Sequence, residues 1–165
     1  MARKSVRPDV SDLPRRVVVG ASCPVLMQRV KDALPSMDIC SEVEDAEPRF
    51  GNDERCREYD VLAHRFDAIA KTVDVHEYFL PKGYRGIASA FVAWIAEARP
   101  VGFYATIPPD EKSLWKKPGR DGLYTLCFRS DGTRGDLYLD SVNGFWSKAW
   151  TFVAFRPVGF ARPSP

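Results

Sequence analysis

The chain has 165 residues, of which 45% are hydrophobic, 12% aromatic and 28% charged, so its composition excludes global disorder and its length fits one domain. The formal net charge of +2 excludes recognition of a partner through a large overall charge. The longest apolar stretch covers only residues 90–96, and because a bilayer needs about 20 apolar residues we expect no transmembrane helix.

Residues 1–14 are predicted to form a flexible basic arm, because this segment is polar and contains Pro8 and Pro14. Its basic residues lead into prolines and acids instead of an apolar segment, so we expect no secretory signal. A single domain is predicted over residues 15–156. Residues 157–165 contain three prolines and are predicted to form a tail outside the fold.

A strand–helix–strand pattern begins the predicted domain. The β-branched run Val17, Val18 and Val19 predicts a buried strand. A turn of small residues follows, and Pro24 suits the first position of a helix that Pro35 ends. A second strand is predicted over residues 37–43, and the short connection would make the two strands parallel.

Two further helices are predicted from the spacing of apolar residues. Over residues 53–73, apolar side chains recur every three or four positions from Tyr59 to Val73, which is typical of one buried helix face. Over residues 84–98 the same spacing is present, but most other positions are apolar as well. This second helix is therefore predicted to be buried on most sides.

The last third of the chain is predicted to form an antiparallel meander. Two dipeptides typical of hairpin turns, Asp131-Gly132 and Asn143-Gly144, separate apolar segments. Because residues 149–155 are apolar on both alternating faces, the last strand is predicted to be central in the sheet or covered on its second side. The predicted strands cover residues 101–107, 123–129, 135–142 and 145–156.

Two-residue turns would fix the register of this meander. Leu126 would then oppose Leu137, and Leu137 would oppose Trp150, with Trp146 on the same face as these residues. This register brings two arginines face to face, so a longer first loop is the alternative. Asp136 and Asp140 would lie on the other face, where they either line a cleft or are solvated.

Together these elements predict an α+β fold in which an N-terminal β-α-β-α unit and a buried helix pack on a C-terminal antiparallel β-meander. The pattern leaves open whether the two halves share one sheet.

The strand–turn–helix at the N-terminus is the first candidate site. Its backbone N–H groups and the positive helix end favour an anion at Gly20, Ser22 and Cys23. The same field would favour the thiolate of Cys23, which makes this residue a candidate nucleophile with His76 as a candidate base. A helix cap beside a buried cysteine explains the same residues without any activity.

The spacing of the four cysteines fits neither a zinc site nor a C-x-x-C redox pair. We therefore expect no metal and no cofactor. Cysteines in a chain without a signal peptide favour reduced thiols in a cytoplasmic, reducing compartment.

The loop over residues 112–120 combines basic side chains with an aromatic ring. Its candidate partner-binding residues are Trp115, Lys116, Lys117 and Arg120, because tryptophan and arginine are frequent at interface hot spots. The same residues, together with the basic arm from Arg3 to Arg16, could hold phosphates and stack on a base. A solvated loop with Trp115 turned into the core accounts for the sequence equally.

The sequence favours a small binding or inhibitor protein that occupies a surface of another macromolecule, with a protein as the expected partner. A phage-encoded or immunity-type accessory protein would have this character. No complete catalytic set is present, which argues against an enzyme. Two alternatives stay open: an enzyme or nucleotide-binding protein with Cys23 as its reactive thiol, and a nucleic-acid-binding protein.

Overall fold

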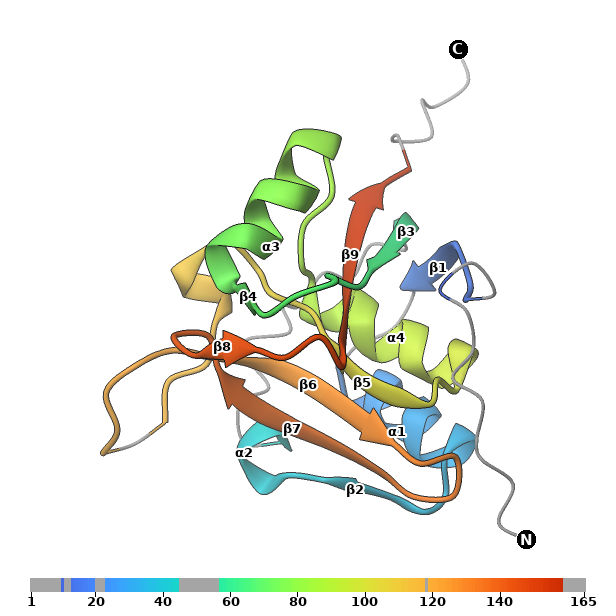
Figure 1. Cartoon of the computed structure of the whole chain (residues 1–165). Coiled ribbons are helices and arrows are strands. Elements are labelled where there is room, and N and C mark those ends of the chain that lie inside the picture. The colour runs from blue at the N-terminus through green and yellow to red at the C-terminus, as the bar shows by residue number, and fades with distance from the viewer. Residues whose placement is uncertain (1–9, 11–12, 20–22, 45–56, 118, 159–165) are drawn as a thin grey trace, which may run out of the picture.

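A mixed seven-stranded sheet separates two layers of helices in the computed structural model of the chain (Figure 1). The structure describes residues 10, 13–19, 23–44, 57–117 and 119–158. In the order in which they lie side by side, the strands are β1 (Arg16–Val19), β3 (Arg57–His64), β9 (Trp150–Pro157), β5 (Gly102–Ala105), β6 (Tyr124–Ser130), β7 (Gly135–Ser141) and β2 (Met37–Ile39). A second, two-stranded sheet pairs β4 (Ala70–Lys71) with β8 (Phe145–Trp146).

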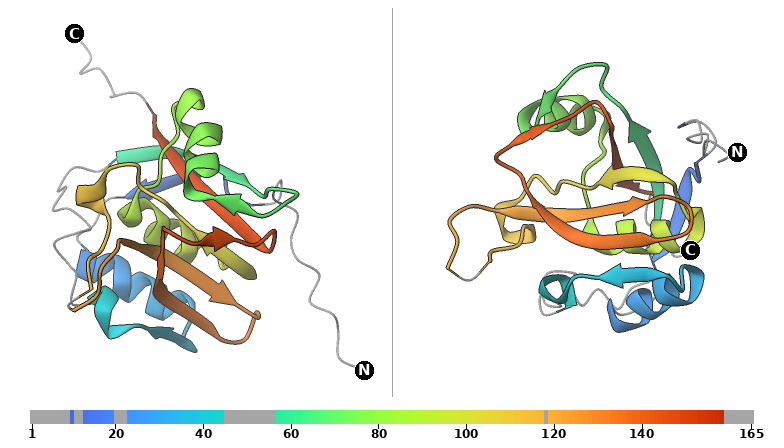
Figure 2. Two further views of the ribbon diagram at one scale, coloured as in Figure 1. Left: turned by 60° about the vertical axis from the view of Figure 1, so that its left-hand side comes forward. Right: turned by 60° about the horizontal axis from the view of Figure 1, so that its bottom comes forward.

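Helices α1 (Cys23–Ala33) and α4 (Ala88–Ala98) lie on one face of the large sheet, and α3 (Thr72–Phe79) lies on the other (Figures 1 and 2). The connections contain the short helix α2 (Ser41–Glu44) and the 3₁₀ helices η3 (Leu80–Lys82) and η4 (Glu111–Ser113). The predicted α+β fold is confirmed, including the buried helix α4 and an antiparallel meander of β5, β6 and β7.

Each face of the sheet carries its own hydrophobic core. Phe91 and Trp94 of α4 pack on the first face, and Val75 and Phe79 of α3 pack on the second. Strand β9 contributes to both cores, since its side chains alternate between the faces. Its residues Val153 and Phe155 belong to the first core, and Phe152 and Ala154 to the second.

Several buried polar groups in this fold make hydrogen bonds, which offset the cost of removing them from water. The hydroxyl of Thr106 donates to the carbonyl of Val153 at 2.8 Å and accepts from the amide of Ile87 at 3.2 Å. The indole N–H of Trp94 donates to the carbonyl of Pro14 at 3.2 Å. Residue 14, placed by sequence in the N-terminal arm, is thereby attached to the core.

The helix predicted over residues 53–73 is wrong for the described residues 57–71. Residues 57–64 form β3, which pairs antiparallel with β1 on one side and β9 on the other. Tyr59 and Val61 are buried at alternating positions, the period of a strand. Their aromatic and β-branched side chains favour a sheet, and pairing with two strands outweighs the helical spacing. A helix begins only at Thr72.

The two N-terminal strands run in the same direction but are not neighbours. The sequence of pairings places β1 and β2 at opposite edges of the sheet, where β2 pairs in parallel with β7. The second strand ends at Ile39, because the short helix α2 begins at Ser41. Both halves of the chain therefore contribute strands to one sheet, which the sequence pattern had left open.

The first hairpin of the meander has the longer loop. Leu126 opposes Leu139 instead of Leu137. The carboxylate of Asp131 accepts from the backbone amides of Thr133 at 2.8 Å and Arg134 at 2.7 Å, and this turn closes a four-residue loop. A shift of two residues leaves every side chain on its predicted face.

The second hairpin does not form between neighbouring strands of the large sheet. After β7 the chain leaves as β8 to pair with β4, and β9 then pairs with β3 and β5. Trp146, Trp150 and Phe152 therefore lie on the face opposite Leu126, which corrects their predicted placement.

Gly86 allows the segment before α4 to pass directly over the chain at Ile107. A Cβ atom at residue 86 would lie 2.3 Å from the carbonyl carbon of Ile107. We expect Gly86→Ala to lower the free energy of unfolding by about 1–3 kcal/mol in urea titrations, because the backbone must shift. Gly144→Ala, where no atom lies within 4 Å, is the matched control and should stay within about 0.5 kcal/mol of wild type. Equal stability of both variants would contradict this close approach.

Candidate binding surface

Part of the second sheet face has no helix over it in the described chain. Helix α3 packs on this face near β9, whereas β6 and β7 lie in front of α1 and α4 with no helix before them in Figure 1. We call the solvent-accessible side chains of this part the aromatic face. It consists of Phe103 and Arg129, which are exposed, and Asp136, Tyr138 and Trp150, which are half-buried.

Two aromatic rings form the apolar part of this face. Phe103 of β5 lies beside Trp150 of β9 in the parallel pairing, with ring centroids 5.6 Å apart. Phe103 is 38% exposed, and Trp150 is half-buried. The ring of Trp150 also meets the edge of the buried Trp146 ring at 4.9 Å. The rings of Phe103 and Trp150 therefore pack against each other, and the buried ring of Trp146 holds Trp150 in place.

A polar group lies next to these rings on β6 and β7. The guanidinium of Arg129 donates to the carboxylate of Asp136 at 2.7 Å and lies 5.2 Å from the ring centroid of Tyr138. Burial raises the pKa of Tyr138, and the neighbouring Cys127 and Asp140 raise it further. The phenol therefore stays protonated at neutral pH and keeps its hydrogen-bond donor.

The carboxylates predicted on the non-core face of the hairpin are indeed on this side of the sheet. Asp136 and Asp140 stand on either side of Tyr138 along β7, at alternate positions that share a face. Strand β2 adds Asp38, which pairs with Asp136 in parallel register and is exposed.

A second exposed apolar group lies on the outer side of the β4–β8 ribbon. Ala70 and Trp146 point inward and are buried, whereas Phe145 is 72% exposed. The amine of Lys71 lies over the ring of Phe145, 5.3 Å from its centroid. Ile69, adjacent to β4, is exposed as well.

The predicted partner-binding loop is bound to the body of the protein. Trp115 exchanges two backbone hydrogen bonds with Tyr124, of 2.8 and 2.9 Å, and its side chain is only 2% exposed. The ring is therefore turned into the core and does not reach a partner at the surface. Lys117 lies 3.0 Å from the carboxylate of Glu42 and over the Tyr124 ring. Lys116 and Arg120 are exposed.

The proposed nucleophile and its base lie on opposite sides of the sheet. Helix α1, on the first face, begins at Cys23. The structure describes the backbone of Cys23 but not its side chain, and Gly20 and Ser22 lie outside the described residues. His76 is on α3, on the second face, with Nε2 at 3.3 Å from the carbonyl oxygen of Ile107. The structure therefore does not bring Cys23 and His76 together.

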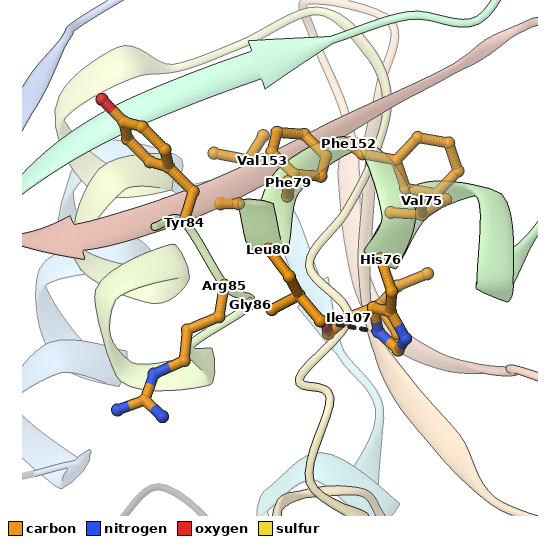
Figure 3. Close-up of a pocket in the computed structure, with 11 residues that line it drawn as sticks. Val75, His76, Phe79, Leu80, Tyr84, Arg85, Gly86, Ile107, Phe152 and Val153 are labelled. Carbon is orange, nitrogen blue, oxygen red and sulfur yellow. Dashed lines mark hydrogen bonds between the residues drawn. The ribbon is translucent and has the colours of Figure 1, made fainter. Parts of the chain in front are cut away.

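A small cavity next to His76 does not provide a substrate site. It encloses about 10 Å³, and side chains such as Val75, Phe79 and Phe152 line it. Figure 3 shows the imidazole turned toward Ile107 and the guanidinium of Arg85 turned away from the cavity. Such a volume holds about one water molecule.

The described residues contain no group of three histidine, cysteine or acidic side chains placed to hold a metal ion. Nor is any helix in the described ranges both long and apolar enough to cross a membrane. No protein-family model, curated protein or solved structure matches the chain. The aromatic face was not predicted as a site, although the alternation of polar and apolar residues in β7 marked its position.

The two histidines link stability to pH. Burial lowers the pKa of both His64, which stacks on Tyr78 at 3.7 Å, and His76. The unfolded chain, with histidine pKa values near about 6.5, then binds protons more readily than the folded chain, so stability falls as the pH decreases through and below that value.

We therefore expect the melting temperature to be lower at pH 5.5 than at pH 7.5, measured by circular dichroism. The variant His64→Gln/His76→Gln should show a smaller decrease over the same interval. An unchanged decrease in this variant would contradict the assignment of the effect to these two rings.

Proposed function

We propose that the protein is a binding or inhibitor protein that occupies a surface of another protein through its aromatic face. The observation that carries this proposal is a set of four side chains on a sheet region that no helix of the described chain covers. Phe103 and Arg129 are exposed, and Trp150 and Tyr138 are half-buried. Tryptophan, tyrosine and arginine are the residues most enriched at the energetic centres of protein interfaces.

The geometry of these side chains lowers the entropic cost of association. Trp150 is held between Phe103 and Trp146, and Arg129 is held by Asp136. Because immobilising a flexible side chain costs about 0.5–1.5 kcal/mol on binding, side chains fixed in advance favour tighter complexes.

A protein partner is favoured over the two alternatives. Aromatic rings on a sheet can stack on bases, but the one guanidinium of the aromatic face is paired with Asp136, and Asp38 and Asp140 would repel phosphates. The sheet lies between α1, which begins at Cys23, and His76 on α3, which counts against an enzyme that uses these two residues as nucleophile and base.

The compartment and biological class belong to the same proposal. Cys127 is buried and Cys40 is half-buried, and both are free thiols. Reduced cysteines are typical of a cytoplasmic compartment. We propose that the protein acts there, as an accessory inhibitor of the phage-encoded or immunity type.

Site-specific photo-crosslinking in the cells that express the protein tests this function. A benzophenone amino acid replaces Phe103 on the aromatic face, or Val18 as a control, which is 49% exposed on β1. We expect a discrete protein adduct from residue 103 and none from residue 18. Adducts of equal yield at both positions, or none at residue 103, would contradict the proposal.

Once the adduct identifies a partner, the aromatic face can be tested by affinity. Arg129→Ala and Phe103→Ala should each weaken binding to that partner by about tenfold or more, as is typical of hot-spot residues. Lys116→Ala, at an exposed position in the loop predicted from sequence, is the control and should leave the affinity within about twofold. Melting temperatures verify that each variant is folded.

A further inference from the structure

The charges around the aromatic face have one predominant sign. Asp136 and Asp140 project from β7, and Asp38 projects from the neighbouring β2 on the same side of the sheet. On these strands and on β6, the opposing charge on this face is Arg129. This side of the three strands thus carries three carboxylates and one guanidinium.

The charge of Arg129 is already compensated within the protein. Its guanidinium is hydrogen-bonded to Asp136 at 2.7 Å and lies over Tyr138. Among the described residues, neither Asp38 nor Asp140 has an ion-pair partner, and Asp140 accepts only a backbone N–H from Ser141 at 2.8 Å. Asp38 and Asp140 therefore give the side of β2 and β7 next to the aromatic face a net negative charge.

The aromatic rings beside these carboxylates favour cations as well. The negative face of an aromatic ring attracts a guanidinium, most strongly in the case of tryptophan. Trp150 and Phe103 expose part of their rings on this side of the sheet. Lys148 is exposed in the connection before Trp150, so a cationic partner would be directed toward β7 and away from that connection.

On the basis of the function proposed above, we propose that the aromatic face binds an arginine-containing segment of the partner protein. The carboxylates of Asp38 and Asp140, which have no ion-pair partner among the described residues, compensate its positive charge. The rings of Phe103 and Trp150 contact its guanidinium groups and their aliphatic stems. A partner segment rich in acids, or a nucleic acid, would be repelled by the same carboxylates.

Titrations of the full-length protein with defined probes test this inference. The probes are a ten-residue peptide in which arginine alternates with alanine, the same peptide with glutamate in place of arginine, and an oligonucleotide of ten thymidines. The indole N–H resonance of Trp150 reports binding by NMR. We expect the arginine peptide to shift this resonance in a saturable manner, and the other two probes to leave it unchanged.

Charge variants show whether the carboxylates of this face are responsible. Asp38→Asn/Asp140→Asn should weaken binding of the arginine peptide about fivefold, since each charge pair at the surface contributes about 0.5 kcal/mol. Asp32→Asn/Asp67→Asn removes two exposed acids elsewhere and should leave the affinity within about twofold. Equal weakening in both variants, or a Trp150 shift with the glutamate peptide or the oligonucleotide, would overturn the inference.

The two proposals can fail separately. A discrete adduct at residue 103 whose crosslinked partner segment lacks arginine would overturn the basic-segment inference and leave the proposed binding function standing. Absence of any adduct at residue 103 would overturn the binding function itself, together with the inference that rests on it.

Discussion

Strand β9 contributes side chains to two hydrophobic cores and forms backbone hydrogen bonds with a strand on each side. The rest of the fold depends on this double requirement. Its alternate residues fill both cores, and its backbone pairs with β3 and β5. Only a segment that is apolar at consecutive positions meets this requirement, and the segment from Phe152 to Phe155 is apolar throughout. A charged residue at any of these four positions would lie in one of the two hydrophobic cores.

The aromatic face is a consequence of where β9 lies. Because β9 pairs in parallel with β5, its first residue, Trp150, comes to lie beside Phe103. The chain between β7 and β9 forms β8, which pairs with β4, and α3 follows β4 directly. This connection places α3 over one part of the second sheet face, and no helix of the described chain covers the part formed by β6 and β7 (Figure 1).

Local patterns predicted the elements whose contacts are local. Helix α4 and the β6–β7 hairpin followed from apolar spacing and alternation. The apolar run before Arg156 predicted a strand that is central or covered on both faces, and β9 meets both descriptions. Strand β3 was missed because Tyr59, Leu62 and Phe66 fit a helix face as well as a strand, and only its pairing with β1 and β9 decides. The partners of β9 and the burial of Trp115 depend on contacts between residues far apart in sequence, so the aromatic face could not be predicted from the pattern alone.

The central position of β9 is tested most directly by NMR distance restraints in solution. The structure predicts backbone Overhauser contacts between Leu62 and Ala154 and ring contacts between Phe103 and Trp150. A backbone contact between Leu137 and Trp150, the pairing of a simple hairpin, would contradict this account of the fold and of the surface that it creates.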